Sequence, residues 1–62
     1  MKILVAEDDA ANRKFLSKLL AKFGDVTVVG DGFQAVKSYM QALDDKEPYQ
    51  LVCLDVMMPK LD

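Results

Sequence analysis

The sequence predicts an α/β fold built on a parallel sheet, and two observations carry that prediction. Short apolar runs of strand type alternate with amphipathic segments of helical period, in the order strand, helix, strand, helix, strand. The connections between these segments are only a few residues long, which favours right-handed crossovers between parallel strands. The 62 residues are therefore expected to form one small α/β unit.

Three segments have the composition of strands. Residues 2–6 and 49–54 are continuous apolar runs, a pattern typical of strands that are covered on both faces of a sheet. Residues 26–29 form a β-branched run between turn-forming residues. Cys53 is the only cysteine, which excludes an internal disulfide, and its position inside the last apolar run predicts an apolar packing role.

The first amphipathic segment predicts a helix over residues 10–23. Asp8 or Asp9 is expected to cap its start, and Gly24 is expected to end it in the left-handed conformation. The predicted apolar face comprises Phe15, Leu16, Leu19, Leu20 and Phe23.

The second amphipathic segment predicts a helix at about residues 33–43, after a turn at Asp31 and Gly32. Pro48 ends any helix before it, because proline disfavours helical backbone in the residue that precedes it. The predicted apolar face comprises Val36, Tyr39, Met40 and Leu43.

Acidic residues follow the first and the last strand segments. Glu7, Asp8 and Asp9 come directly after the first, and Asp55 comes directly after the last. Because the carboxyl ends of parallel strands meet at one edge of a sheet, three or four acids are expected to gather there. Such a cluster repels itself unless it surrounds a cation or shares a proton. The alternatives are that the first group only caps the following helix and that Asp55 only forms a turn.

Composition restricts the partners of this segment. The net charge is −2 with the signs interspersed, so neither a nucleic-acid footprint nor a membrane-binding basic cluster is expected. The apolar runs are too short to span a membrane, and the first of them meets acids too soon for a signal peptide. A cytoplasmic protein is expected.

Three motifs occur in a fixed order along the chain. They are ILVAEDD at residues 3–9 followed by Asn12-Arg13, Asp31-Gly32 followed by Ala35, and LDVMMP at residues 54–59. In this order and spacing they resemble the first half of a response regulator receiver domain of the CheY type. The resemblance covers the whole chain. It implies a flavodoxin-like parallel sheet with strand order 2-1-3, with residues 1–62 as the N-terminal half of a receiver.

The resemblance also implies a role for each residue of the acidic site. Asp55 matches the aspartate that accepts a phosphoryl group. Asp8 matches a direct carboxylate ligand of Mg²⁺ (or Mn²⁺), to which Asp55 and the backbone carbonyl of Met57 also contribute. Glu7 matches the acid that holds the ion largely through water, and Pro59 supports the loop. These roles are chemically reasonable, because phosphoryl transfer needs mainly alignment and charge neutralisation from a protein.

The function implied by the resemblance is a phosphoacceptor module of two-component, or phosphorelay, signalling. Such a module is not an enzyme for a separate substrate, but it promotes its own phosphorylation with Mg²⁺, and its partner is a histidine kinase or phosphotransfer protein. The Ser/Thr and Lys that contact the phosphoryl group in the family have no counterpart here. The alternative is a non-switching fragment that pairs with a missing C-terminal half or with itself through the third strand. Asn12 and Arg13 are expected to be solvated helix positions.

Overall fold

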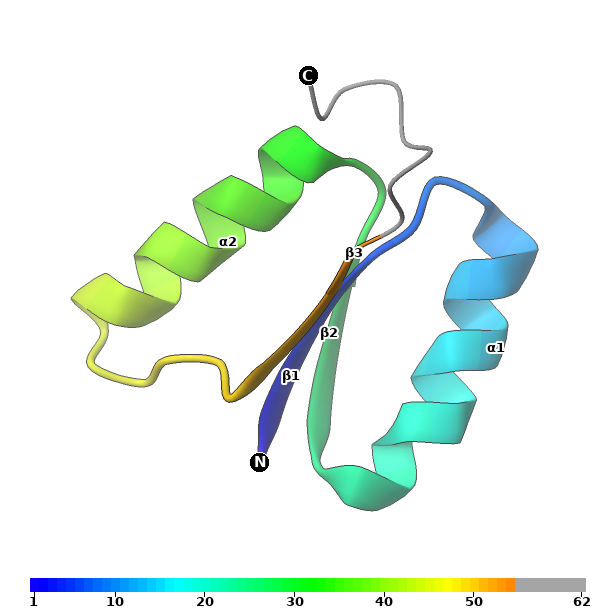
Figure 1. The fold of residues 1–62 in the computed structure, drawn as a ribbon, viewed down its shortest axis with the longest axis horizontal. Helices are drawn as coiled ribbons and strands as arrows, with labels where there is room; N and C mark the ends of the chain where they lie inside the picture. Colours follow the sequence, from blue (N-terminus) through cyan, green and yellow to red (C-terminus); the bar gives the residue numbers. More distant parts are fainter. Residues whose placement is uncertain (55–62) are drawn as a thin grey trace.

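The computed structural model describes residues 1–54 of the chain. The elements of this part are β1 (Lys2–Ala6), α1 (Ala10–Leu20), the short 3₁₀ helix η1 (Ala21–Phe23), β2 (Asp25–Val29), α2 (Gly32–Asp44) and β3 (Leu51–Leu54) (Figure 1). The predicted βαβαβ order is therefore confirmed.

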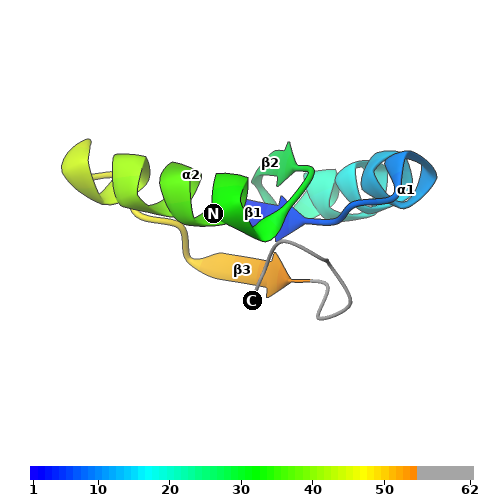
Figure 2. The same ribbon diagram turned by 90° about the horizontal axis from the view of Figure 1, so that it is seen from above.

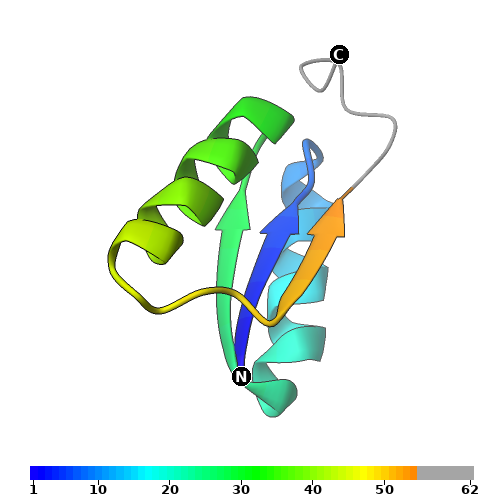
Figure 3. The same ribbon diagram turned by 60° about the vertical axis from the view of Figure 1, so that its left-hand side comes forward.

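The three strands form one parallel sheet in the order β2-β1-β3, as the sequence predicted. All three run in the same direction, with β1 in the centre (Figure 3). In this register Ile3 lies opposite Val26 on one side and Leu51 on the other. β2 and β3 therefore lie on opposite sides of the central strand β1. Because all three strands are parallel, their carboxyl ends lie together along one edge of the sheet.

The two helices cover opposite faces of the sheet (Figure 2). Both pack over β1 and β2. Seen from above, β3 lies clear of both helices (Figure 2). β3 is consequently the least covered strand, and Leu51, Val52 and Leu54 are 40%, 39% and 48% exposed.

The core is centred on β1, because among the three strands of residues 1–54 it alone has a neighbour on both edges and a helix on each face. Its last four residues are at most 1% exposed: Ile3, Leu4, Val5 and Ala6. Side chains alternate along a strand, so Leu4 and Ala6 share one face, where they pack with Ala35 of α2. Val29 and Tyr49 complete that cluster at its margin.

The predicted apolar face of α2 stays largely exposed, and the side chains that this helix buries are small ones. Ala35 and Ala42 are each 4% exposed, whereas the four predicted side chains are between 38% and 60% exposed. Alanine allows the helix axis to approach the strands closely, which turns the larger neighbours to the flanks of the contact. Some of these larger side chains line an apolar groove beside β3. Its lining residues are Leu4, Ala35, Val36, Tyr39, Val52 and Leu54.

The first helix is shorter than predicted and buries less. The α-helix ends at Leu20, and residues 21–23 tighten into the 3₁₀ turn η1. Of the predicted apolar face, Leu16 and Leu20 are half-buried, whereas Phe15, Leu19 and Phe23 are 63%, 42% and 55% exposed. The described part of the chain has no second layer over these three side chains. Neither helix of this part has the length and apolar character needed to cross a membrane.

Gly24 does not adopt the predicted left-handed conformation. Its φ of 159° and ψ of −161° lie outside the left-handed helical region, in a positive-φ conformation that L side chains rarely adopt. The position also needs glycine because a Cβ atom there would collide with the backbone of Met1. Met1 is held at this place by the backbone N–H of Asp25, which donates to the Met1 carbonyl at 2.8 Å.

The second helix ends in a motif that the sequence did not reveal. The N–H of Glu47 donates to the Ala42 carbonyl at 2.9 Å, and the N–H of Lys46 donates to the Leu43 carbonyl at 3.1 Å. Lys46 has φ 60°, the left-handed conformation that usually belongs to glycine in this Schellman arrangement. α2 thus ends at Asp44 through its own C-terminal hydrogen bonds, four residues before Pro48.

The third strand starts at Leu51, two residues later than predicted. The preceding segment is held to β1 by polar contacts: the Lys2 ammonium donates to the Glu47 carbonyl at 2.6 Å and lies 4.8 Å from the Tyr49 ring centroid. Cys53 is half-buried opposite Val5 and is a free thiol, consistent with a packing role at the margin of the sheet.

Candidate functional site

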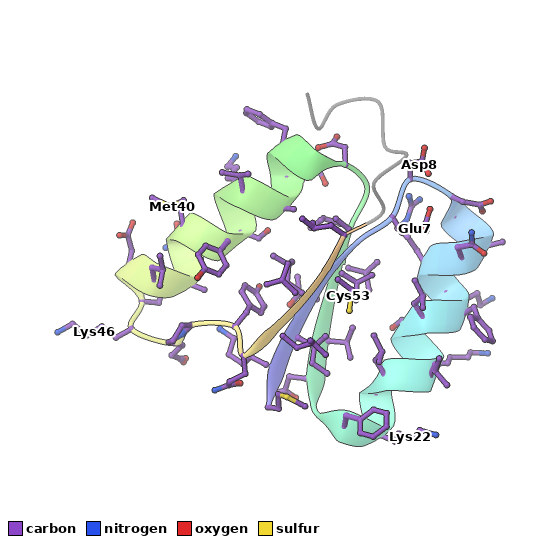
Figure 4. All side chains as sticks on the ribbon, in the orientation of Figure 1. Glu7, Asp8, Lys22, Met40, Lys46 and Cys53 are labelled. Carbon is purple, nitrogen blue, oxygen red and sulfur yellow. The ribbon has the colours of Figure 1, made fainter. Side chains whose placement is uncertain are left out.

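The candidate site lies at the carboxyl end of β1, in the turn that leads to α1. Glu7 and Asp8 are adjacent in this turn, beside the start of the helix (Figure 4). The N–H of Glu7 donates to the Val29 carbonyl at 3.1 Å, which extends the β1–β2 ladder by one bond. The sheet therefore fixes the backbone up to Glu7, and the chain leaves the sheet at Asp8.

Asp9 is the N-cap of α1, so one of the two predicted capping alternatives is confirmed. Its side chain accepts from the N–H of Ala11 at 2.8 Å and from the N–H of Asn12 at 3.4 Å. The cap satisfies two of the free N–H groups at the helix start. Both bonds go to the same oxygen, Oδ1 of Asp9.

Glu7 and Asp8 have different surroundings. Glu7 is only 8% exposed, and its Oε1 accepts from the N–H of Asp9 at 3.1 Å, which folds the turn back on the strand end. Asp8 is exposed, and no described residue donates a hydrogen bond to its carboxylate. A buried, hydrogen-bonded acid beside an exposed and open one is suited to two roles, one of support and one of direct ligation.

Arg13 contacts this turn, which corrects the expectation that it is a solvated helix position. It is half-buried, and its Nη1 donates to the carbonyl of Glu7 at 3.0 Å and to the carbonyl of Asp8 at 3.1 Å. Asn12 is exposed, as predicted. One signal in the sequence could have identified Arg13: it follows the cap by one helical turn, and long helical side chains point back toward the helix start.

The residues of this turn fit a hard divalent cation in their chemistry. Carboxylate oxygens with water are the ligands that Mg²⁺ prefers, and the open Asp8 carboxylate would be the direct ligand in such a site. Within residues 1–54, no group of three or more His, Cys, Asp or Glu residues lies together in a geometry that could hold a metal ion.

The predicted roles of Asp55, Met57 and Pro59 fall outside the described residues. What the described part does establish is the register of the strand that leads to them. Leu54 lies opposite Ala6 in the parallel ladder, so β1 and β3 end at the same edge of the sheet. The next residues in the sequence are Glu7 after β1 and Asp55 after β3.

Comparison with known proteins shows what the chain is similar to. The chain is 39% identical over 62 residues to the response regulator receiver protein CpdR of Brucella abortus, and 34% identical over 64 residues to a probable chemotaxis protein CheY of Rhizobium etli. It is also 39% identical over 61 residues to hybrid signal transduction histidine kinase I of Dictyostelium discoideum. These alignments cover 98%, 100% and 97% of this chain, respectively.

Over nearly its whole length the chain is similar to response regulator receiver domains. It spans 48% of CpdR, 46% of the CheY protein and 4% of the hybrid kinase. No protein-family model matches it. No solved structure matches it either. Its βαβαβ order and parallel sheet agree with the CheY-like fold that the sequence predicted.

Proposed function

We propose that this receiver chain carries the phosphoacceptor site of a two-component phosphorelay. In this proposal Asp55 takes a phosphoryl group from a histidine kinase or a phosphotransfer protein, with Mg²⁺ or Mn²⁺ bound nearby. Two kinds of observation support it. The relatives include a response regulator receiver protein and a hybrid histidine kinase, and the ladder register ends β1 and β3 at one edge.

The register is the observation that carries the proposal. Ala6 and Leu54 are paired, and in the sequence Glu7 directly follows the first of them and Asp55 directly follows the second. In open parallel sheets, functional groups lie just beyond the carboxyl ends of the strands. These ends all lie at the same edge, because each crossover brings the chain back to the opposite edge before the next strand begins. Glu7 and Asp8 already lie there, and Asp55 follows the paired residue Leu54 directly.

The proposed step is the transfer of a phosphoryl group between two nucleophiles. A carboxylate oxygen of Asp55 forms the new P–O bond, and the imidazole nitrogen of the donor keeps the electron pair of the broken P–N bond. Asp8 and Asp55, with the Met57 carbonyl, would hold the cation directly, and Glu7 would hold it through water. The bound cation would neutralise the charge that otherwise repels an anionic phosphoryl group from three acids.

Acetyl phosphate with Mg²⁺ tests the proposal. Intact-mass measurement should show one added phosphoryl group, peptide mapping should place it on Asp55, and hydroxylamine should remove it. Asp55→Asn should abolish the label. Asp44→Asn, at an exposed acid in the last turn of α2, is the matched control and should retain it. Label that persists at full yield in Asp55→Asn would contradict the assignment.

A second candidate function rests on the exposed third strand. β3 lies clear of both helices, and its three large apolar side chains are between 39% and 48% exposed (Figure 2). An uncharged outer strand with unpaired backbone groups is a surface on which another strand can pair. In this alternative the 62-residue chain acts by association, with a complementary segment or a second copy, and the acids are not phosphorylated.

A further inference from the structure

The turn between β1 and α1 is held by a charged side chain that reaches back from the helix. Nη1 of Arg13 donates to two successive main-chain carbonyls, those of Glu7 and Asp8, at 3.0 and 3.1 Å. The N–H of the same residue donates to the Asp9 carbonyl at 2.9 Å. Three consecutive carbonyls of the acidic turn are thus bonded to one residue.

Among residues 1–54, no strand residue donates to the carbonyl of Glu7 or Asp8, and the bond to the Asp9 carbonyl is the first helical bond of α1. The last ladder bond from this end of β1 is the one from the Glu7 N–H to the Val29 carbonyl. Beyond it the chain has left the strand, so its carbonyls need other donors or water. A guanidinium is a strong donor for this purpose, since charge-assisted hydrogen bonds are shorter and stronger than neutral ones.

The contact also leaves the direct ligand open. Arg13 bonds to the carbonyl of Asp8, whereas no described residue donates to the Asp8 carboxylate. A guanidinium paired with that carboxylate would compete with a cation for its oxygens. A guanidinium that bonds to the carbonyls fixes the backbone of Asp8 and leaves the Asp8 carboxylate oxygens available to a cation.

We infer that Arg13 is a positioning residue for the cation site: it orders the Glu7–Asp8 backbone so that the Asp8 carboxylate is presented ready for ligation. This inference rests on the proposed function as far as the cation is concerned. Its structural half, the ordering of the turn, holds for the metal-free chain as well.

Positioning and plain charge predict opposite signs when Arg13 is neutralised. Removing a positive charge near a cation site strengthens cation binding, by an amount that water and salt reduce. Loosening the backbone of a ligand weakens binding, and loss of such supporting contacts typically costs 10–100-fold in metal affinity. Lys14 is the matched control, because it carries the same charge at the next position, is exposed, and its side chain makes no hydrogen bond with a described residue.

The experiment is a Mn²⁺ titration, followed by electron paramagnetic resonance, of the unaltered chain, Arg13→Gln and Lys14→Gln at one ionic strength. Arg13→Gln should raise the Mn²⁺ Kd roughly tenfold. Lys14→Gln should lower it by less than about twofold, as expected for a screened charge. A Kd for Arg13→Gln that is unchanged or lower than that of the unaltered chain would overturn the inference.

Metal-free hydrogen exchange separates this inference from the proposed function. Without cation, the amides of residues 8–10 should exchange several-fold faster in Arg13→Gln than in Lys14→Gln, and equal rates would overturn the positioning role. An unaltered chain that binds no Mn²⁺ would refute the proposed cation site while leaving the exchange result to decide on Arg13. If Arg13→Gln does not fold, the guanidinium signals of Arg13 in the unaltered chain decide: restricted rotation of its Nη groups supports the contact, and free rotation refutes it.

Discussion

Ala6 of β1 lies directly opposite Leu54 of β3 in a parallel ladder. This pairing converts a separation of nearly fifty residues in the sequence into a shared edge of the sheet. It aligns the acidic turn after β1 with the point at which the chain leaves β3. A change of register by one residue would exchange the faces of β3, so the apolar packing of the strand and the alignment of this edge depend on each other.

The first prediction concerns the two aspartates of the turn. Asp8→Asn should weaken Mg²⁺ or Mn²⁺ binding by roughly tenfold or more, because it removes the charge of the open carboxylate. Asp9→Asn should change the affinity far less, since asparagine caps a helix as well as aspartate does. Isothermal titration of both variants provides the measurement. Equal losses of affinity in the two variants would contradict the assignment of Asp8 as a metal ligand and Asp9 as a helix cap only.

The second prediction concerns the end of α2. Lys46→Gly should raise the free energy of unfolding by about 0.5–1 kcal/mol. Glycine adopts the left-handed conformation without the strain that an L side chain incurs, and this gain is larger than the entropy that glycine adds to the unfolded chain. Urea denaturation measures the change. Lys37→Gly, in the interior of the same helix, is the control and should destabilise by a similar amount. A Lys46→Gly chain less stable than the unaltered one would contradict the role given to the Schellman motif.

The third prediction compares two glycines. Gly24→Ala should destabilise the chain by about 1–2 kcal/mol, because the added methyl group displaces Met1 and breaks the bond from the Asp25 N–H to the Met1 carbonyl. Gly30→Ala should cost less, since its nearest new contact is Arg13 Nη1 at an ordinary 3.5 Å. Thermal unfolding followed by circular dichroism ranks the two. The reverse order would show that the approach of Met1 is not what requires glycine.

The fourth prediction concerns association of the 62-residue chain through β3. Its sedimentation coefficient should rise with concentration, and Val52→Lys should reduce that rise, because a charge on an outer strand opposes pairing with another strand. Thr27→Lys places the same side chain at an exposed position of β2, the other outer strand, and should leave association unchanged. An unaltered chain that stays monomeric from micromolar to millimolar concentration would argue against association.

Local patterns were enough to predict the elements and their order. Apolar runs and helical spacing placed every strand and helix to within about two or three residues, and the short connections predicted the parallel arrangement. The N-cap of α1 was predicted to be either Asp8 or Asp9, because an acid directly before an amphipathic helix is a typical cap, and the structure shows that it is Asp9. Such features depend on near neighbours in the chain, which the sequence displays directly.

The same patterns failed where the distance between elements decides the outcome. The sequence could not tell that α2 buries Ala35 and Ala42, because every apolar residue on one stripe is an equally good candidate until the helix is placed. It could not tell that Gly24 serves the approach of Met1, since that contact joins residues far apart in the sequence.

For the candidate site, the sequence by itself determined which acids follow which strands, and therefore which edge of a parallel sheet they reach. Only the tertiary structure decided how Glu7, Asp8 and Asp9 differ in burial and in hydrogen bonding. Glu7 is buried in the turn, Asp8 is open, Asp9 caps the helix, and Arg13 holds the carbonyls of the first two. The physical reason is that three adjacent carboxylates are alike in a sequence, and they become different only when backbone geometry gives each its own donors and its own access to water.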